Sequence, residues 1–230
     1  MLKNLKIGTR LAVMLGSVIF MMVVSSVLAL VDMRAIEDHL DEIVHDNIQK
    51  MNFVQDMSES VHIVSRVMRT VVLLHDDAAI DKETAKIDAA RAKYTEAESA
   101  LDKFPASEKG MAIRTKIKEA RDRARELNNK VIKLAHEHQD KEALDILLNE
   151  GAPATLRWQE ALDENIHLQK ENTAKDYERA VASYVSARNI LIIVCVVALL
   201  LASSLGYFVT KSITVPLFAA VEVAQKVARG

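Results

Sequence analysis

The sequence is poor in the residues that interrupt helices. Its 230 residues include six glycines and three prolines, and neither residue occurs between Ser17 and Phe104 or between Ala154 and Leu205. Aromatic residues make up 4% of the chain, whereas charged residues make up 27%. Because sheets are rich in aromatic and β-branched residues and helix interiors exclude glycine and proline, this composition predicts long helices rather than sheet.

Side chains that carry chemistry are also sparse. The single cysteine, Cys195, lies inside an apolar stretch, so one chain can form neither a disulfide framework nor a cysteine metal site. No nucleophile–base constellation, glycine-rich phosphate loop or catalytic carboxylate pair stands out, and we expect neither catalysis nor a cofactor. On a helix, His136 and His138 would point about 160° apart. They could not share a metal ion in that geometry, so we expect no metal site.

The formal net charge of −2 conceals a division along the chain. Residues 32–188 contain 31 acidic and 24 basic residues, whereas the two ends together contain six basic residues and one acidic residue. The basic ends flank two apolar stretches, and cytoplasmic flanks of membrane-spanning helices carry an excess of Lys and Arg. This pattern predicts that both termini are cytoplasmic and that the acidic middle lies outside the cytoplasm.

The two apolar stretches are residues 11–31 and 190–209, which contain no charged side chain. Each is long enough to cross a hydrocarbon layer of about 30 Å as a helix. The first could be read as a cleaved signal peptide, whose apolar core usually has about 7–15 residues and ends at a small-residue cleavage site. The observed stretch is longer and passes directly into Asp32, so we predict two uncleaved transmembrane helices.

Four helices are predicted between these stretches. In the first, residues 32–75, apolar residues recur every three or four positions, which is typical of the buried seam of a bundle helix. The seam consists of Met33, Ile36, Leu40, Ile43, Met51, Val54, Met57, Val61, Val64, Met68 and Val71, with a polar interruption at Asn47 and Lys50. The other helices are predicted at residues 78–103, 108–138 and 142–188, the last with an irregularity at residues 151–153.

Short turns join these helices. Asp77 is the expected N-cap of the second helix, and Ser107 that of the third. Four helices with short connections form an antiparallel up-down-up-down bundle. Since the first and fourth helices run into the apolar stretches without a breaker, we predict an all-α bundle continuous with two transmembrane helices. The turns at Asp76 and Asp140 would lie farthest from the membrane.

Residues 212–230 resemble the first helix of a HAMP domain. The markers are Ile213, Pro216, Leu217, Glu222, Ala224, Val227, Ala228 and Gly230, with Pro216 predicted to mark a turn after the second span. Residues 5–11, residues 47–51 and residues 65–74 look like parts of bacterial methyl-accepting chemotaxis proteins. The whole chain therefore resembles the N-terminal part of such a chemoreceptor.

The resemblance implies five parts in a homodimeric, multi-pass protein of the bacterial inner membrane. They are a cytoplasmic arm (1–10), a transmembrane helix (11–31), a periplasmic four-helix-bundle sensor (32–188), a second transmembrane helix (189–209) and a truncated HAMP helix (210–230). The family's methylation helices and kinase-contacting tip are absent, which suggests a truncated receptor or gene fragment. A chemotaxis histidine kinase and coupling protein could be reached only through that absent signalling domain.

The implied function is sensing of a small extracytoplasmic solute, an organic acid or amino acid, for chemotaxis. The signal would be a small sliding of the fourth helix and its span, which Pro216, Leu217 and Glu222 would carry into HAMP. One alternative is the input module of a sensor histidine kinase or cyclase, and another is a membrane-anchored helical scaffold without a ligand. The basic third helix lies between acidic helices, so we expect an ion-paired face and no nucleic-acid binding.

The first candidate ligand site involves Arg66 and Arg69, which share a helix face that points away from the apolar seam. In the amino-acid chemoreceptors that the chain resembles, arginines of this helix hold the ligand's carboxylates at the dimer interface. Thr70, Thr155 and Trp158 would complete the site. Leu73 stands where a third arginine would be useful. The alternative is two surface arginines paired with nearby acids.

A second candidate site lies on the third predicted helix. Arg114, Arg121 and Arg125 are separated by seven and four residues, so they share one face. They would face Tyr94 and Thr95 of the second helix and could hold an organic anion between the helices. The alternative is that these arginines are solvated surface residues.

Overall fold

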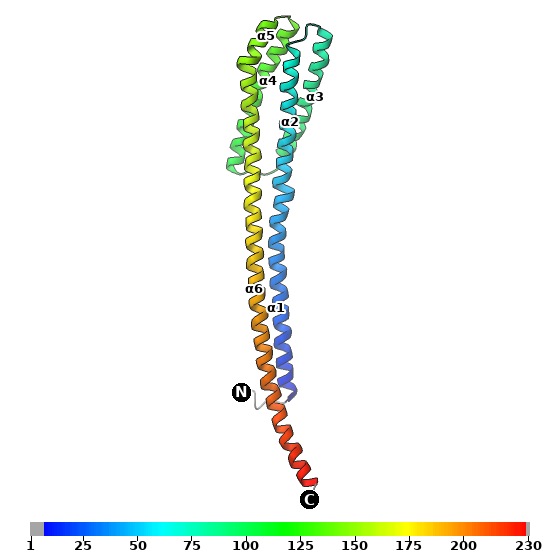
Figure 1. The fold of residues 1–230 in the computed structure, drawn as a ribbon, viewed down its shortest axis with the longest axis vertical. Helices are drawn as coiled ribbons and strands as arrows, with labels where there is room; N and C mark the ends of the chain where they lie inside the picture. The colour runs from blue at the N-terminus through cyan, green and yellow to red at the C-terminus, as the bar shows by residue number, and fades with distance from the viewer. Residues whose placement is uncertain (1–6, 229–230) are drawn as a thin grey trace. The chain divides into compact units, whose positions relative to one another are not determined.

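The computed structural model describes residues 7–228, and these residues form helices joined by short turns (Figure 1). The elements are α1 (Ile7–Asp41), the π-helix η2 (Glu42–Asn47), α2 (Ile48–Val71), α3 (Asp77–Leu101), α4 (Glu108–His136), α5 (Asp140–Ile146), the π-helix η3 (Leu147–Gly151) and α6 (Ala152–Ala228). Most of the predicted cytoplasmic arm and the HAMP marker Gly230 lie outside the described residues.

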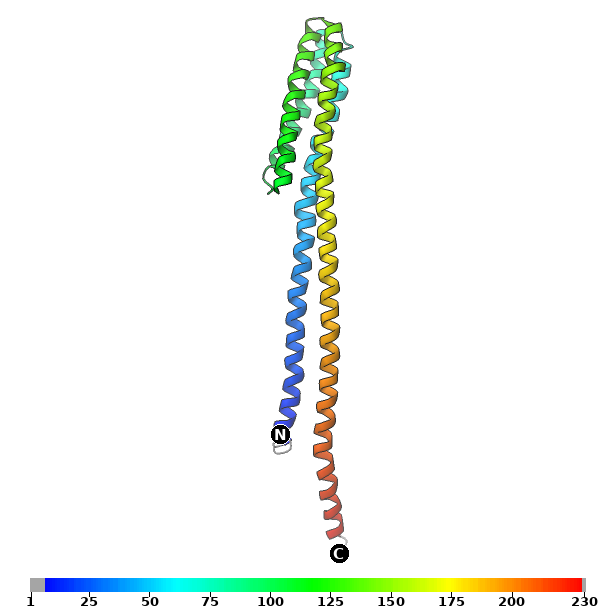
Figure 2. The same ribbon diagram turned by 90° about the vertical axis from the view of Figure 1, so that its left-hand side faces the viewer.

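The chain divides into two compact units, of which Leu40–Tyr177 is one. Within this unit, α2, α3, α4 and the run α5–η3–α6 lie side by side and alternate in direction (Figures 1 and 2). The predicted all-α four-helix bundle is confirmed. The other unit combines the chain up to His39 with the chain from Glu178 onward, so α6 contributes to both units.

The apolar seam of the first predicted helix forms the centre of the bundle from Val54 to Val71. Its six residues in this stretch are all buried, as are apolar residues at helical spacing on the partner helices. The prediction fails at Met33 and Leu40, which are 65% and 49% exposed. Periodicity shows which residues share a face, but burial also requires neighbouring helices, and the common core begins only at Val54.

An aromatic pair joins α3 to α6 inside this core. Tyr94 and Trp158 are 1% and 2% exposed, and their rings meet edge to face with centroids 5.0 Å apart. The indole Nε1–H of Trp158 donates a hydrogen bond to the Tyr94 hydroxyl over 3.1 Å. Each polar atom therefore satisfies the other in a place that water does not reach, and burial raises the pKa of the Tyr94 phenol.

Side-chain caps fix the helix starts. The Ser107 hydroxyl accepts a hydrogen bond from the backbone N–H of Gly110 at 3.2 Å, which confirms Ser107 as the N-cap of α4. The N-cap of α3 is Asp76, whose carboxylate accepts from the N–H of Ala79 at 2.9 Å. Asp77 was the wrong choice because α3 begins one residue earlier than predicted, which places Asp77 in its first turn.

Two π-helical segments occur where the sequence pattern is interrupted. The segment η2 ends at Asn47, whose side-chain amide donates to Asp176 at 2.8 Å and so links the start of α2 to α6. The segment η3 ends at Gly151, which agrees with the predicted irregularity. Pro153 follows it in the first turn of α6, and because proline has no amide N–H, a wider preceding turn suits it.

Two helices contain stretches long and apolar enough to cross a membrane, and these stretches are not buried within the structure. The predicted turn at Pro216 is wrong, since α6 continues through it to Ala228. A proline inside a helix removes one backbone hydrogen bond, here the one that Ser212 would accept. The residues after Pro216 include Leu217, Ala219 and Ala220, which favour helix strongly enough for it to continue.

The Tyr94→Phe substitution should lower the free energy of unfolding by about 1–3 kcal/mol, because the buried Trp158 N–H loses its acceptor. Urea unfolding of the full chain in detergent, followed by the fluorescence of Trp158, the single tryptophan, measures this change. Tyr177→Phe is the matched control, since Tyr177 is largely exposed. Equal effects of the two substitutions would contradict the assigned role of the Tyr94 hydroxyl.

Candidate functional site

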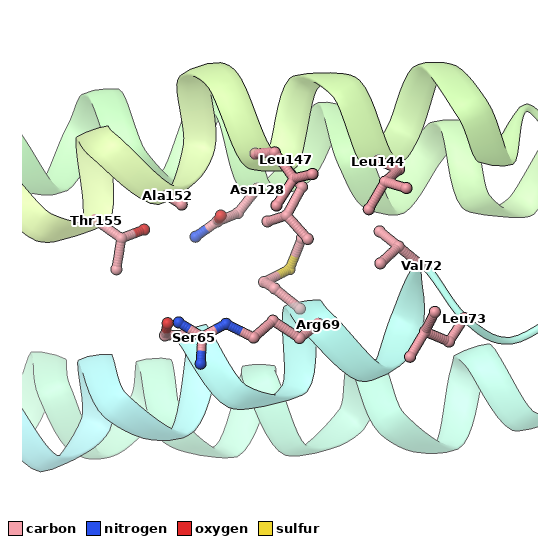
Figure 3. Close-up of a pocket in the computed structure, with 11 residues that line it drawn as sticks. Ser65, Arg69, Val72, Leu73, Asn128, Leu144, Leu147, Ala152 and Thr155 are labelled. Carbon is pink, nitrogen blue, oxygen red and sulfur yellow. The ribbon is translucent and has the colours of Figure 1, made fainter.

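A cavity of about 210 Å³ lies inside the bundle unit between α2 and the run α5–η3–α6, with α4 behind it (Figure 3). Its wall is mainly apolar and comes from both sides. The apolar lining residues are Met68, Val72, Leu73, Leu144, Leu147, Leu148 and Ala152. The volume is below that of drug-sized ligand pockets, about 300–1,000 Å³, so the cavity suits a smaller molecule.

The polar lining residues gather at one end of the cavity. Ser65 and Arg69 come from α2, Asn128 from α4 and Thr155 from α6. Figure 3 shows the Arg69 guanidinium extending toward Ser65, with Asn128 reaching in from behind, whereas Leu144, Val72 and Leu73 lie at the opposite end. The cavity is therefore amphipathic, with one cationic and hydrogen-bonding end and one apolar end.

Asn128 is the most unusual of these residues. It is 1% exposed, and its amide Nδ2 has no hydrogen-bond partner among the described residues. A buried amide N–H without an acceptor costs free energy, and native structures satisfy nearly all such groups. An acceptor atom at the polar end of the cavity, such as a water or a carboxylate oxygen, would satisfy the Asn128 amide.

The structure brings together only part of the first predicted site. Arg69 and Thr155 line the cavity, whereas Arg66 and Thr70 do not, and the Thr70 hydroxyl donates to the Arg66 carbonyl. Arg66 and Arg69 are both exposed, as expected for a face turned away from the seam. Trp158 does not line the cavity, because its ring is part of the core and is hydrogen-bonded to Tyr94.

Sequence reasoning missed Ser65 and Asn128. A signal for Asn128 was present: it lies four residues after Ala124 and three before Val131, and both are buried on α4. A polar residue at a core position of a helix is the kind of deviation that marks a site or a buried network. Ser65 carries no comparable signal, since a serine next to the seam is ordinary.

The residues of the second predicted site have different partners. Arg114 donates to the Phe104 carbonyl at 3.1 Å, whereas Arg121 donates to Glu98 at 2.6 Å. The Arg125 guanidinium lies over the Tyr94 ring, 5.4 Å from its centroid. Thr95 is exposed and bonds to the backbone of its own helix. The arginines of this face therefore have their own protein contacts between α3 and α4.

Three arginines, Arg91, Arg121 and Arg125, lie close together at this α3–α4 contact. Arg91 from α3 lies close enough to Arg125 to be affected by its charge, and burial together with that charge lowers the pKa of Arg91. Burial and the neighbouring Arg121 likewise lower the pKa of Arg125. The Nε and Nη2 atoms of Arg125 are buried without a hydrogen-bond partner among the described residues. Arg121 pairs with Glu98 and with Asp122, whereas Arg91 pairs with Asp88.

The helix α4 ends at His136, two residues earlier than predicted, and His138 adopts a left-handed backbone with φ 53°. Regular helical geometry therefore does not apply to this pair of histidines. The argument that their side chains point about 160° apart on a helix was wrong. Within the described residues 7–228, no group of three or more His, Cys, Asp or Glu side chains is arranged to hold a metal ion.

Comparison with known proteins gives one family match. Residues 4–184 match the family described as "Four helix bundle sensory module for signal transduction". The match covers the bundle unit and extends into the chain on both sides of it. A search of curated proteins finds no match to the chain.

The Glu98→Gln substitution should lower the free energy of unfolding by about 1–3 kcal/mol, because it removes the carboxylate that pairs with the largely buried Arg121 and that offsets the charge of Arg125. Glu126→Gln is the control, since Glu126 pairs with Arg123 on the exposed surface, where such pairs contribute less than about 1 kcal/mol. Urea unfolding followed by Trp158 fluorescence compares the two. A Glu98→Gln loss no larger than that of the control would contradict this role.

Proposed function

The chain belongs to the family of four-helix-bundle sensory modules for signal transduction, and from this premise we propose that it is the sensing and transmitting part of a bacterial chemoreceptor. The observation that carries the proposal is the amphipathic cavity inside the bundle, which has an arginine and an unsatisfied buried amide at one end. The helix that contributes Thr155 to this cavity is α6, and α6 also contains the second apolar stretch.

The proposed ligand is a small organic acid with a compact apolar body. Arg69 can bind a carboxylate through two parallel N–H groups, and the Asn128 amide and the Thr155 hydroxyl can donate to its oxygens. The described lining residues include no Asp or Glu that would pair with the ammonium group of an amino acid. Of the two ligand classes expected from the sequence, this favours the organic acid.

The proposed setting is the bacterial inner membrane. Two unburied apolar helical stretches and the membrane-anchored character of the family support a protein that crosses the membrane twice. The excess of Lys and Arg at both ends supports cytoplasmic termini, with the bundle in the periplasm. The protein would act as a receptor rather than as an enzyme.

The proposed signal is a small displacement of α6. A ligand can shift a conformational equilibrium only by the difference between its affinities for the two states. Because Thr155 on α6 and Arg69 on α2 both line the cavity, a carboxylate bound to both would favour one relative position of these helices. Pro216, Leu217 and Glu222 lie further along α6, where Glu222 pairs with Lys226 at 3.0 Å, and they would pass the displacement to a HAMP domain.

The proposed receptor is a homodimer. Leu73 and Leu148 line the cavity but are 72% and 60% exposed, and Leu156 of α6 is exposed as well. Clusters of exposed leucine are uncommon on monomeric proteins and often mark interfaces. A second copy packed on this face would cover the cavity. A chemotaxis histidine kinase and coupling protein would then be reached through a cytoplasmic signalling domain.

Branched aliphatic or aromatic monocarboxylates should stabilise the full chain in detergent by about 2.7 kcal/mol at roughly one hundred times Kd. Thermal melts against a panel of monocarboxylates, dicarboxylates and amino acids measure this shift through Trp158 fluorescence. Arg69→Gln should abolish the shift, and Arg66→Gln should preserve it, because Arg66 does not line the cavity. A shift lost in Arg121→Gln but kept in Arg69→Gln would move the site to the α3–α4 contact, and no shift with any compound would favour a ligand-free scaffold.

Leu148→Lys should weaken the dimer at least about tenfold, since a charge at the centre of an apolar interface is strongly unfavourable. Sedimentation equilibrium in detergent measures the dissociation constant. Met111→Lys is the control, because Met111 is a comparably exposed apolar residue on α4. Equal weakening by both substitutions, or by neither, would count against this face as the interface.

A further inference from the structure

Three histidines gather where the α2–α3 turn meets the α4–α5 turn, and each faces an aspartate of another element. His75 Nδ1 lies 3.2 Å from Asp140 of α5. His136, the last residue of α4, lies 3.5 Å from Asp77, and His138 Nε2 lies 3.9 Å from the same carboxylate. We name these three histidines together with Asp77, Asp81 and Asp140 the histidine clasp.

His136 has the most informative geometry. Its Nδ1 faces Asp77 and its Nε2 faces Asp81, both at 3.5 Å. A neutral imidazole has one N–H donor and one acceptor nitrogen, whereas an ionised carboxylate only accepts. In the neutral form, one of the two contacts would therefore place an acceptor nitrogen of the ring against an acceptor oxygen of a carboxylate. Only the imidazolium can donate toward both carboxylates.

His138 occupies a left-handed backbone position that glycine most often fills. The N–H of Gln139 bonds to the Leu134 carbonyl at 2.9 Å, and the N–H of His138 bonds to the Ala135 carbonyl at 3.1 Å. These two bonds form a Schellman motif, in which the residue with positive φ is usually glycine. The left-handed turn at His138, with φ 53°, ends α4 and places this histidine near Asp77.

The charges around the clasp come from three elements. Asp77 and Asp81 on α3 face His136, and Asp140 on α5 faces His75. Within α4 and its cap, Lys133 pairs with Glu137 at 3.7 Å. In the described part of the chain, no lysine or arginine pairs with the three clasp aspartates. The histidines are thus the groups that can neutralise them.

Two other histidines, His45 and His167, face carboxylates that lie close to them in the sequence. His45 and His167 face carboxylates four residues away on their own helices, at 3.6 and 3.3 Å. Their protonation would affect one helix, whereas protonation of the clasp would join separate elements. This contrast provides a matched control.

We propose that the histidine clasp is a proton-binding site through which the bundle responds to external pH. Near pH 6.5, where histidine ordinarily titrates, proton uptake converts the three contacts into charge-assisted pairs between separate elements. The unfolded chain lacks these contacts, so the stability that the charge-assisted pairs add is gained as the pH falls through this range. Below that range the aspartates themselves become protonated and the gain is lost.

The clasp adjoins the cavity along the chain. Val72 and Leu73 precede His75, and Leu144 follows Asp140 by one helical turn, so the pair of His75 and Asp140 connects the two walls of the cavity. Acid would hold these walls together and change ligand affinity. This second consequence rests on the proposed function, whereas proton binding by the clasp does not.

The test is the melting temperature of the full chain in detergent, measured by Trp158 fluorescence between about pH 8 and about pH 5.5 without ligand and with a chelator present. We expect the melting temperature to rise by about 3 °C or more on acidification. The variant with His75→Gln, His136→Gln and His138→Gln should lose this rise. The control variant with His45→Gln and His167→Gln should keep it. A flat profile in the unmodified protein, or a rise that survives in the clasp variant, would overturn the proposal.

A second measurement does not depend on a substituted chain. Nuclear magnetic resonance of the chain labelled in its seven histidines follows each imidazole through its titration. The pH range over which the resonances of the three clasp histidines change should coincide with the rise in melting temperature, and a rise outside that range would overturn the proposal. A stabilisation that appears only when Zn²⁺ is added would also overturn it, because the occupant would then be a metal ion. None of these readouts uses the organic acid. A failure of the proposed proton binding can therefore be distinguished from a failure of the proposed ligand binding in the cavity.

Discussion

The constraint on which the structure depends is that α6 must present two different surfaces along one continuous helix. Between Ala154 and Gln169 it buries one stripe against three other helices, and from Ile190 to Val209 it has no charged side chain on any side. A stripe is satisfied by protein neighbours, whereas an all-round apolar surface is satisfied by lipid. Any force that acts on the striped part is applied to the same backbone that continues into the apolar part.

Within the bundle, the buried polar groups fall into two kinds. Tyr94 with Trp158, and Asn47 with Asp176, are pairs whose atoms satisfy each other between helices that are far apart in the sequence. Such pairs fix the register of helices that apolar packing alone would leave free to slide. Asn128 instead points its amide into a cavity without an acceptor. The paired groups join helices of the bundle, whereas the unpaired Asn128 amide lines the candidate ligand site.

The charged side chains of the bundle also fall into groups with different surroundings. Arginines with carboxylate or carbonyl partners, such as Arg121 and Arg114, hold α3 to α4. Arg69 lies at the mouth of a mainly apolar cavity without such a partner in the described structure, and carboxylates in the turns face histidines rather than lysines. The bundle thus combines an ion-paired α3–α4 face with turns in which aspartates face histidines.

The sequence by itself determined the all-α fold, the two apolar stretches, the buried seam from Val54 to Val71 and the cap at Ser107. These features follow from local rules, namely the periodicity of one helix, the absence of helix breakers and the geometry of a single turn. It also indicated the exposed face that carries Arg69. The tertiary structure decided which side chains meet across helices, such as Arg121 with Glu98 and His136 with Asp77 and Asp81, and that Arg69 and Thr155 line one cavity. It also showed that Trp158 belongs to the core and that α6 passes through Pro216. Such contacts depend on the rotation and axial offset of each helix against its neighbours, which the packing of the whole core sets and which no single stretch of sequence contains.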